Sequence, residues 1–180
     1  MVYVFLANGF EEIEALAPVD IMRRAGIECL TVGVGSKTVT GSHNICVTAD
    51  IKTDEIDYGK IDAVVLPGGM PGTTNLEKSE DVINALKYAY ENGKTVAAIC
   101  AAPSVLGHLG MLKGKTATCY SGYEKELIDA NAVDKPVCCD GQIITARGAG
   151  VAQSFGFALV EKLVNKTTAE KIKLSMKCEG

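Results

Sequence analysis

Short apolar runs alternate with stretches of helical periodicity along almost the whole chain, and this alternation constrains the fold more than any other feature. The apolar runs lack the in-and-out pattern of a half-exposed strand, so each is expected to be buried on both faces. Buried strands separated by helices form a parallel sheet that is covered on both sides. The sequence therefore predicts an open, doubly wound α/β fold with a mainly parallel sheet.

The individual strands and helices are predicted from the periodicity of apolar residues and from the glycine and proline residues that end them. Strands are predicted at 2–7, 27–35, 62–69, 94–100 and 115–120, and helices at 9–26, 79–93, 101–108, 123–130, 151–166 and 168–177. An irregular hairpin is expected at 38–50, and a second at 137–146, where Asp-Gly separates two β-prone arms. The apolar stripe of the first helix is predicted to be Ile13, Leu16, Ala17, Ile21 and Ala25.

Length and charge limit the possible classes of protein. The 180 residues contain no linker or repeat, which predicts a single domain over 1–180. Net charge is −4 and the basic residues are scattered, which argues against a nucleic-acid partner or a polybasic membrane contact. No apolar run approaches the roughly 20 residues that cross a bilayer. The N-terminus lacks a basic leader segment, so the expected location is the cytoplasm.

The seven cysteines do not indicate a metal or cofactor site. No pair has C-x-x-C spacing, and the chain contains only two histidines, so no metal is expected. Gly33-Val34-Gly35 lacks the third glycine of a dinucleotide fingerprint, and a phosphate-binding P-loop is also missing. We therefore expect no cofactor, and most of the thiols are interpreted as small buried hydrophobic residues.

The strongest candidate for chemistry is Cys100. It ends the predicted strand at 94–100, and Pro103 follows within the first turn of the next helix. Ligands of open α/β sheets bind beyond the carboxyl ends of the strands. A cysteine at a tight strand-to-helix turn is exposed like the residue of a nucleophile elbow, and helix N–H groups would favour its thiolate. The alternative is a core cysteine at the end of a strand.

Two further segments reach the same edge of the sheet. The glycines of Pro67-Gly68-Gly69 expose backbone N–H groups that an oxyanion hole needs, although the same pattern also suits a plain turn. Glu14 lies near the start of the first helix, where its carboxyl group could meet the sulfur of Cys100. The alternative for Glu14 is a solvated glutamate, which is the interpretation for Glu11 and Glu12.

Four segments, in order, resemble signatures of the ThiJ/PfpI superfamily: EEIEALAPVDIMRRAGI (11–27), DAVVLPGG (62–69), AAICAAPSVLG (97–107) and ITARGAG (144–150). The resemblance is to the branch of the parkinsonism-associated protein deglycase and its bacterial relatives, and it covers nearly the whole chain. It implies a flavodoxin-like or class I glutamine amidotransferase-like fold. It also implies a homodimer with an interface at the 38–50 hairpin and the first helix.

The resemblance assigns roles to single residues. The reactive cysteine falls on Cys100, the glutamate that contacts it on Glu14, and the oxyanion-binding N–H groups on Gly69 and Ala101. Substrate or anion-binding positions fall on Gly68, Arg24 and Tyr120. The chain departs from the pattern where relatives carry other residues: Tyr120 stands for a histidine, His43 for an arginine and Ala149 for a proline.

The implied function is a cysteine-dependent glyoxalase or deglycase, a hydro-lyase or hydrolase, that acts on methylglyoxal, glyoxal or their early protein and thiol adducts. An alternative is a redox sensor or chaperone of oxidative stress that uses oxidation of Cys100. A peptidase or amidase is disfavoured because Ala101, and not histidine, follows Cys100, while His108 and His43 lie elsewhere in the sequence. Cys119 is a candidate second thiol on the same side of the sheet.

Overall fold

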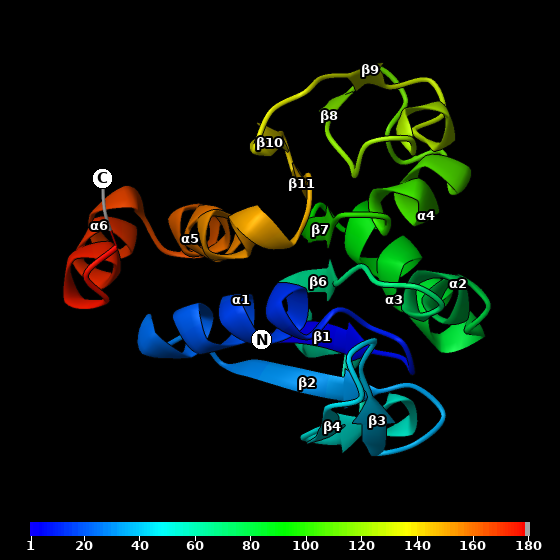
Figure 1. The fold of residues 1–180 in the computed structure, drawn as a ribbon, viewed down its shortest axis with the longest axis horizontal. Coiled ribbons are helices and arrows are strands. Elements are labelled where there is room, and N and C mark those ends of the chain that lie inside the picture. Colours follow the sequence, from blue (N-terminus) through cyan, green and yellow to red (C-terminus); the bar gives the residue numbers. More distant parts are fainter. Residues whose placement is uncertain (179–180) are drawn as a thin grey trace.

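The computed structural model describes residues 1–178, and its centre is a seven-stranded sheet (Figure 1). The strand order is β10-β11-β7-β6-β1-β2-β5, and every pairing is parallel except that of β10 with β11. The strands are β1 (Val2–Leu6), β2 (Cys29–Gly33), β5 (Ile51–Lys52), β6 (Ala63–Leu66), β7 (Thr95–Ile99), β10 (Val137–Asp140) and β11 (Ile143–Ala146). The order β2-β1-β6-β7-β11 is that of flavodoxin-like folds, so the predicted fold class is confirmed.

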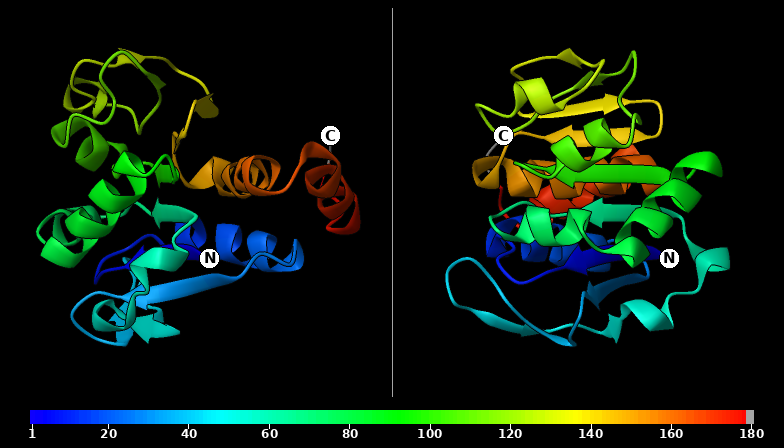
Figure 2. Two further views of the ribbon diagram at one scale, coloured as in Figure 1. Left: turned by 180° about the vertical axis from the view of Figure 1, so that it is seen from behind. Right: turned by 90° about the vertical axis from the view of Figure 1, so that its right-hand side faces the viewer.

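Helices cover both faces of the sheet, as Figure 1 and the two further views in Figure 2 show. One face carries α1 (Glu12–Arg24), α5 (Ala152–Leu163) and α6 (Lys166–Ser175), and the other carries α2 (Gly72–Glu77), α3 (Glu80–Glu91) and α4 (Pro103–His108). Ser79 caps α3 by accepting a hydrogen bond from the Val82 N–H, and Gly93 follows it with a positive φ of 66°.

Each central strand contributes alternate side chains to two hydrophobic cores, one on each face of the sheet. In β1, Val2, Val4 and Leu6 pack toward α1, α5 and α6, whereas Tyr3 and Phe5 pack toward α2, α3 and α4. Because successive side chains of a strand point to opposite faces, a strand between two helix layers must be apolar throughout. The burial of every residue in β1 follows from this position.

Outside the sheet, the expected elements are only partly present. The 38–50 hairpin is confirmed as β3 (Thr38–Thr40) paired with β4 (Cys46–Thr48), and the 137–146 hairpin as β10 with β11. The helix predicted at 123–130 is wrong, since only a 3₁₀ turn, η3 (Glu124–Glu126), forms there. The strand predicted at 115–120 shrinks to β8 (Thr116–Ala117), paired with β9 (Asn131–Ala132). Helix α2 and strand β5 were not expected.

The stripe predicted for α1 is wrong at its first two positions. Ile13 is 56% exposed and Leu16 is 36% exposed, whereas Glu12 and Glu14 are buried. Periodicity identifies an apolar stripe but does not show which neighbour it meets. The N-terminal turns of α1 place their carboxylates toward the interior and leave apolar side chains outside. None of the helices among residues 1–178 is long and apolar enough to span a membrane.

The packing of α5 on α1 depends on Gly156. A Cβ at this position would lie 2.9 Å from Ile21 Cδ1 and 3.1 Å from Pro18 Cα, so the two helix backbones approach closely there. We expect Gly156→Ala to lower the free energy of unfolding by about 1–2 kcal/mol, because overpacking outweighs the gain in helix propensity. Urea unfolding followed by circular dichroism measures the change.

Gly150→Ala is the matched control, because a Cβ at residue 150 meets nothing within 4 Å. The control should leave stability nearly unchanged. Equal or greater stability of Gly156→Ala than of the wild type would show that α1 and α5 are not in tight contact at this position.

Candidate active site

Cys100 lies directly beyond β7, at the edge where the central parallel strands end. Its N–H donates to the Ala146 carbonyl at 2.9 Å, and its carbonyl accepts from the Tyr120 N–H at 2.8 Å. Its φ is +66°, in the left-handed region that non-glycine residues avoid. Backbone strain of this kind is typical of a nucleophile elbow, which presents one side chain at the end of a strand.

Glu14 extends from the first turn of α1 to the same point. The residue is 1% exposed, its Oε2 accepts the Gly68 N–H at 2.9 Å, and its carboxyl group lies close enough to the thiol of Cys100 that each group shifts the pKa of the other. A Cβ on Gly68 would lie 2.6 Å from both Cys100 Cβ and Glu14 Oε2. Only glycine therefore allows the loop after β6 to approach the cysteine and the glutamate together.

Burial is the largest influence on the pKa of Glu14. Desolvation raises its pKa from 4.5 to about 7, against the opposing hydrogen bonds from Cys100 and Gly68. At neutral pH the carboxyl group is then about half ionised, near the pKa that suits a general acid and base. The same group can accept a proton from the thiol and later return it.

The pKa of the Cys100 thiol is raised, whereas the sequence predicts that it is lowered. Burial raises its pKa to about 12, the charge of Glu14 adds to the effect, and the N–H groups of Ala101 and Gly69 oppose it. The N–H groups of Ala101 and Gly69 do favour the thiolate, but burial and Glu14 outweigh them, so the expected lowering of the pKa is wrong. Helix α4 has only six residues, and desolvation outweighs its influence. While Glu14 is ionised, Cys100 stays a thiol.

The backbone N–H groups of Gly69 and Ala101 both lower the pKa of the Cys100 thiol, against the larger effect of burial. Gly69 has a φ of +90°, and a Cβ there would lie 2.4 Å from Glu11 N and 2.6 Å from Gly9 O. The chain can bring this N–H to the sulfur only because residue 69 has no side chain. Two fixed donors at one point are what an oxyanion hole requires.

A cavity of about 450 Å³ adjoins this cluster, and its lining includes Tyr120, Arg147 and Gly148. The Tyr120 ring lies 3.4 Å from where a Cβ on Gly148 would stand, and Glu14 Oε1 lies 4.0 Å from the same point. Glu14 Oε1 is buried and has no hydrogen-bond partner within residues 1–178. Arg147 was not singled out by the sequence, although it belongs to the segment 144–150 that was expected at this edge.

Other candidate residues lie apart from the cluster. Arg24 is at the opposite end of α1 from Glu14, exposed and paired with Asp20 at 2.7 Å. Cys119 is buried beside a smaller cavity of about 190 Å³, where burial raises its pKa to about 11. His108 bridges Glu77 and Glu126, with 2.9 Å from its Nε2 to Glu126 Oε2.

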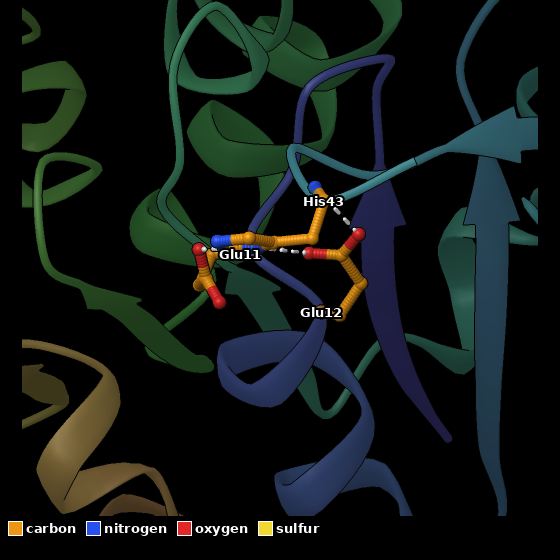
Figure 3. A group of neighbouring side chains, drawn as sticks. All are labelled: Glu11, Glu12 and His43. Atoms are coloured by element: carbon orange, nitrogen blue, oxygen red, sulfur yellow. Dashed lines mark hydrogen bonds and ion pairs between the residues drawn. The ribbon is translucent and has the colours of Figure 1, made fainter. Parts of the chain in front are cut away.

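His43 lies in the loop between β3 and β4 and faces the start of α1 (Figure 3). Its Nδ1 is 3.0 Å from Glu12 Oε2, and its N–H donates to Glu12 Oε1 at 2.9 Å. The interpretation of Glu12 as solvated is wrong, because the residue is only 5% exposed. Burial by itself raises the pKa of Glu12, but hydrogen bonds from His43 and Ile45 have the larger combined effect and lower the pKa to about 2. Glu11, Glu12 and His43 form a cluster of metal-ligand type, but the histidine and Ser42 already satisfy its carboxylates.

The raised pKa of Glu14 makes stability depend on pH. The folded protein holds a proton on Glu14 between pH 4.5 and about 7 that the unfolded chain has lost. The stabilisation from this proton is complete below pH 4.5 and is lost as pH rises through 7. Relative to Glu14→Gln, the wild type should lose on the order of 3 kcal/mol of unfolding free energy between pH 4.5 and 8. Denaturant titrations at several pH values measure the difference.

Glu91→Gln, at an exposed position on α3, is the control and should follow the wild type at every pH. A constant difference between wild type and Glu14→Gln across this pH range would contradict a buried, half-ionised Glu14.

Comparison with known proteins identifies relatives along most of the chain. The sequence model of the DJ-1/PfpI family matches residues 1–162. Protein dj-1beta of Drosophila melanogaster is 36% identical over 172 residues, which are 94% of this chain and 92% of that protein. Deglycase PfpI of Pyrococcus furiosus is 32% identical over 146 residues, 80% of this chain and 87% of that protein.

The chain spans only 38% of another relative, protein DJ-1 homolog B of Arabidopsis thaliana, with 36% identity over 167 residues, 92% of this chain. Among solved structures, oxidized DJ-1 of Toxoplasma gondii is similar with a TM-score of 0.93 and 34% identity, covering 98% of this chain and 97% of that one. Sequence and fold thus agree over nearly the whole length, and the chain belongs to the DJ-1/PfpI family.

Proposed function

We propose that this protein is a cysteine-dependent glyoxalase or deglycase that acts on methylglyoxal, glyoxal or their early adducts with thiols and amines. One observation carries the proposal: Cys100, with a φ of +66° beyond the end of β7, and the buried Glu14 meet at Gly68, where a Cβ would lie 2.6 Å from both Cys100 Cβ and Glu14 Oε2. The N–H groups of Gly69 and Ala101 act on the same thiol. A nucleophile, a proton carrier and an oxyanion hole thus converge on one atom.

With methylglyoxal, the reaction needs no external oxidant. Glu14 removes the thiol proton as Cys100 sulfur adds to the aldehyde carbon, and the N–H groups of Gly69 and Ala101 stabilise the oxyanion before it is protonated. Glu14 then takes the proton from the first carbon and delivers it to the second through an enediol, while the hydroxyl proton of the first carbon passes to the oxygen of the second. The aldehyde carbon is thereby oxidised to a thioester and the ketone carbon reduced to an alcohol. Water hydrolyses the resulting thioester, which releases lactate and restores the thiol.

The relatives support this class of chemistry. Two of the similar proteins, from Pyrococcus furiosus and Pyrococcus abyssi, are named deglycases, at 32% and 31% identity. In a deglycase reaction, the same cysteine would attack the carbonyl-derived carbon of a hemithioacetal or aminocarbinol. The amine or thiol would leave with the proton that Glu14 returns.

A redox sensor would use the same residues, since the N–H groups of Gly69 and Ala101 could also hold an oxidised sulfur. Peroxide, however, reacts with thiolates, and the pKa of Cys100 is raised to about 12. A thiol that loses its proton only when Glu14 accepts it suits turnover better than spontaneous oxidation. A peptidase remains disfavoured because His43 and His108 are held by carboxylates away from Cys100.

Lactate formation from methylglyoxal tests the enzyme, in a buffer free of amines and thiols. We expect reduced wild type to produce lactate, and Cys100→Ser and Glu14→Gln to lose at least about 100-fold in kcat/KM, the size of an acid–base contribution. Cys119→Ser is the matched control and should retain the wild-type rate, because its sulfur lines a different cavity.

Wild type that forms no more lactate than Cys100→Ser would refute the glyoxalase proposal. Mass spectrometry after peroxide treatment then addresses the sensor: oxygen added at Cys100 in wild type, and less in Glu14→Gln, would favour it.

We also propose that the protein forms a homodimer through the start of α1 and the β3–β4 hairpin. Ile13 and Leu16 on α1 and Ile45 in the hairpin are large apolar side chains that are exposed in the single chain. Hydrophobic surface of this kind marks association sites. Sedimentation should give a dimer for wild type and a monomer for Ile13→Lys.

Leu174→Lys, at a 73% exposed position on α6, is the control and should remain dimeric. A monomeric wild type, or an Ile13→Lys variant that stays dimeric, would contradict this interface.

A further inference from the structure

The two backbone donors of the proposed oxyanion hole lie at the starts of two neighbouring helices. Gly69 precedes α2, whose Thr73 N–H donates to the Gly69 carbonyl at 2.8 Å. Ala101 precedes α4, whose Ser104 N–H and hydroxyl group donate to the Ala101 carbonyl at 3.1 and 2.7 Å. The helices lie side by side on one face of the sheet (Figure 1). Each donor is bonded to the first turn of its helix, so its place depends on where that helix lies.

The last residues of the same helices meet at His108. His108 ends α4, Glu77 ends α2 and Glu126 ends the 3₁₀ turn η3. Nδ1 of the imidazole ring lies 2.5 Å from Glu77 Oε1, and Nε2 lies 2.9 Å from Glu126 Oε2. An ionised carboxylate only accepts hydrogen bonds, so the ring bonds both partners only when each nitrogen carries a proton. The geometry therefore fits the charged imidazolium.

The bond between His108 and Glu77 is the one hydrogen bond that joins α2 to α4 within residues 1–178. The loop before α2 is held elsewhere: Gly68 bonds to the N–H of Glu11 and to Oε2 of Glu14, at 2.9 Å each. Those two bonds fix the loop relative to α1, and neither reaches α4. Past the ends of β6 and β7, the His108–Glu77 pair is thus the polar contact that holds α2 against α4.

Packing between these elements is interrupted by a cavity of about 300 Å³. Its lining includes Thr73 of α2, Ser104 and His108 of α4, and Tyr123, which precedes η3. The Thr73 hydroxyl group is buried and has no hydrogen-bond partner within residues 1–178. Since neither close packing nor a second polar contact joins the helices across this space, α2 can shift relative to α4 at small cost once the pair at His108 is lost.

The charged groups that face the His108 ring are the two carboxylates. Glu77 approaches from α2 and Glu126 from η3, while α4 itself carries no other ionisable side chain. Hydrogen bonds to Glu126 and Glu77 raise the pKa of His108, against the opposing effect of burial. A neutral imidazole keeps only one N–H, so the loss of its proton leaves one carboxylate facing a nitrogen lone pair. The bridge between the helices therefore depends on pH.

We propose, on the basis of the proposed function, that protonated His108 is a positioning residue that holds α2 against α4 through Glu77. The N–H groups of Gly69 and Ala101 then keep the spacing that binds the oxyanion. Loss of the proton releases α2, and the two donors no longer converge on the oxyanion. Turnover therefore has an alkaline limit set by His108, in addition to its need for ionised Glu14 at lower pH.

The pH dependence of lactate formation from methylglyoxal tests this role. The kcat/KM of wild type should rise through pH 7 as Glu14 ionises, and should then fall about three- to fivefold as His108 loses its proton, the size of effect of one exposed ion pair. The Cys100 thiol does not cause such a fall, because its pKa is about 12. His108→Gln should be about three- to fivefold slower than wild type near pH 7 and should show no alkaline fall.

Three further variants identify the partner that matters. Glu77→Gln removes the tie to α2 and should reproduce the profile of His108→Gln. Glu126→Gln keeps that tie and should retain the fall, but at lower pH, because one carboxylate fewer stabilises the imidazolium. Lys87→Gln removes a positive charge from an exposed position on α3 and should follow wild type. An alkaline fall that persists unchanged in His108→Gln, or a Lys87→Gln profile that matches it, would overturn the assignment.

A measurement without substrate separates this inference from the proposed function. The Glu14→Gln variant removes the carboxyl group nearest to the loop, so its titration no longer interferes. The carbonyl carbon signal of Gly69 and the ring signals of His108 are then followed by NMR between about pH 6 and pH 9, a range that includes the titration of histidine. The two sets of signals should share one midpoint, and the Gly69 shift should be absent when His108→Gln is added.

A shared midpoint supports the positioning role even if wild type forms no lactate, in which case the proposed function alone fails. A Gly69 signal that stays constant while His108 titrates would overturn the role, whether or not the protein turns over methylglyoxal.

Discussion

The close approach of the buried Glu14 carboxyl group to Cys100 is the contact on which the rest of this site depends. Removing a carboxyl group from water is unfavourable, and the pKa of about 7 measures how strongly the protein resists its charge. The Gly68 N–H bonds to Oε2, while Oε1 has no hydrogen-bond partner within residues 1–178. A carboxyl group that ionises near neutral pH has the property that the proposed proton transfer to and from sulfur requires.

The conformation of the backbone brings the groups of this contact together. A Cβ on Gly68 would stand 2.6 Å from Cys100 Cβ, and one on Gly69 would stand 2.4 Å from Glu11 N, so the loop after β6 needs glycine at both positions. Cys100 itself adopts a left-handed conformation that costs roughly 1–2 kcal/mol. Hydrogen bonds from its backbone to Ala146 and Tyr120 hold it there. The rigid sheet, with its two separate cores, supplies the framework against which this strain is maintained.

Hydrogen bonds hold the β3–β4 hairpin against α1, the helix that carries Glu14. Glu12 is ionised with a pKa of about 2 and accepts hydrogen bonds from His43 and Ile45, so the hairpin loop is fixed at the first turn of α1. Glu14 is two residues farther along that turn, and its pKa of about 7 leaves it near half ionised at neutral pH. Neighbouring glutamates on one helix therefore have different charges because one meets an imidazole and N–H groups while the other meets a thiol in an apolar setting.

Much of the fold was predictable, because apolar strands and amphipathic helices are local patterns. The doubly wound sheet, both hairpins and the position of Cys100 at the end of β7 follow from strand composition, glycine and proline stops, and the rule for strand ends. The predicted helix at 123–130 and the stripe at Ile13 and Leu16 failed because polar composition and periodicity do not reveal which surface a neighbouring segment covers.

The α/β sheet and the place of Cys100 at the edge where the parallel strands end could be read from the amino-acid sequence, because these features depend on residues close together along the chain. The burial of Glu12, the raised pKa of the Cys100 thiol and the place of Arg147 in the lining of a cavity follow from tertiary packing alone. Desolvation and charge act between segments far apart in the sequence, so pKa values and cavities exist only once the elements have packed.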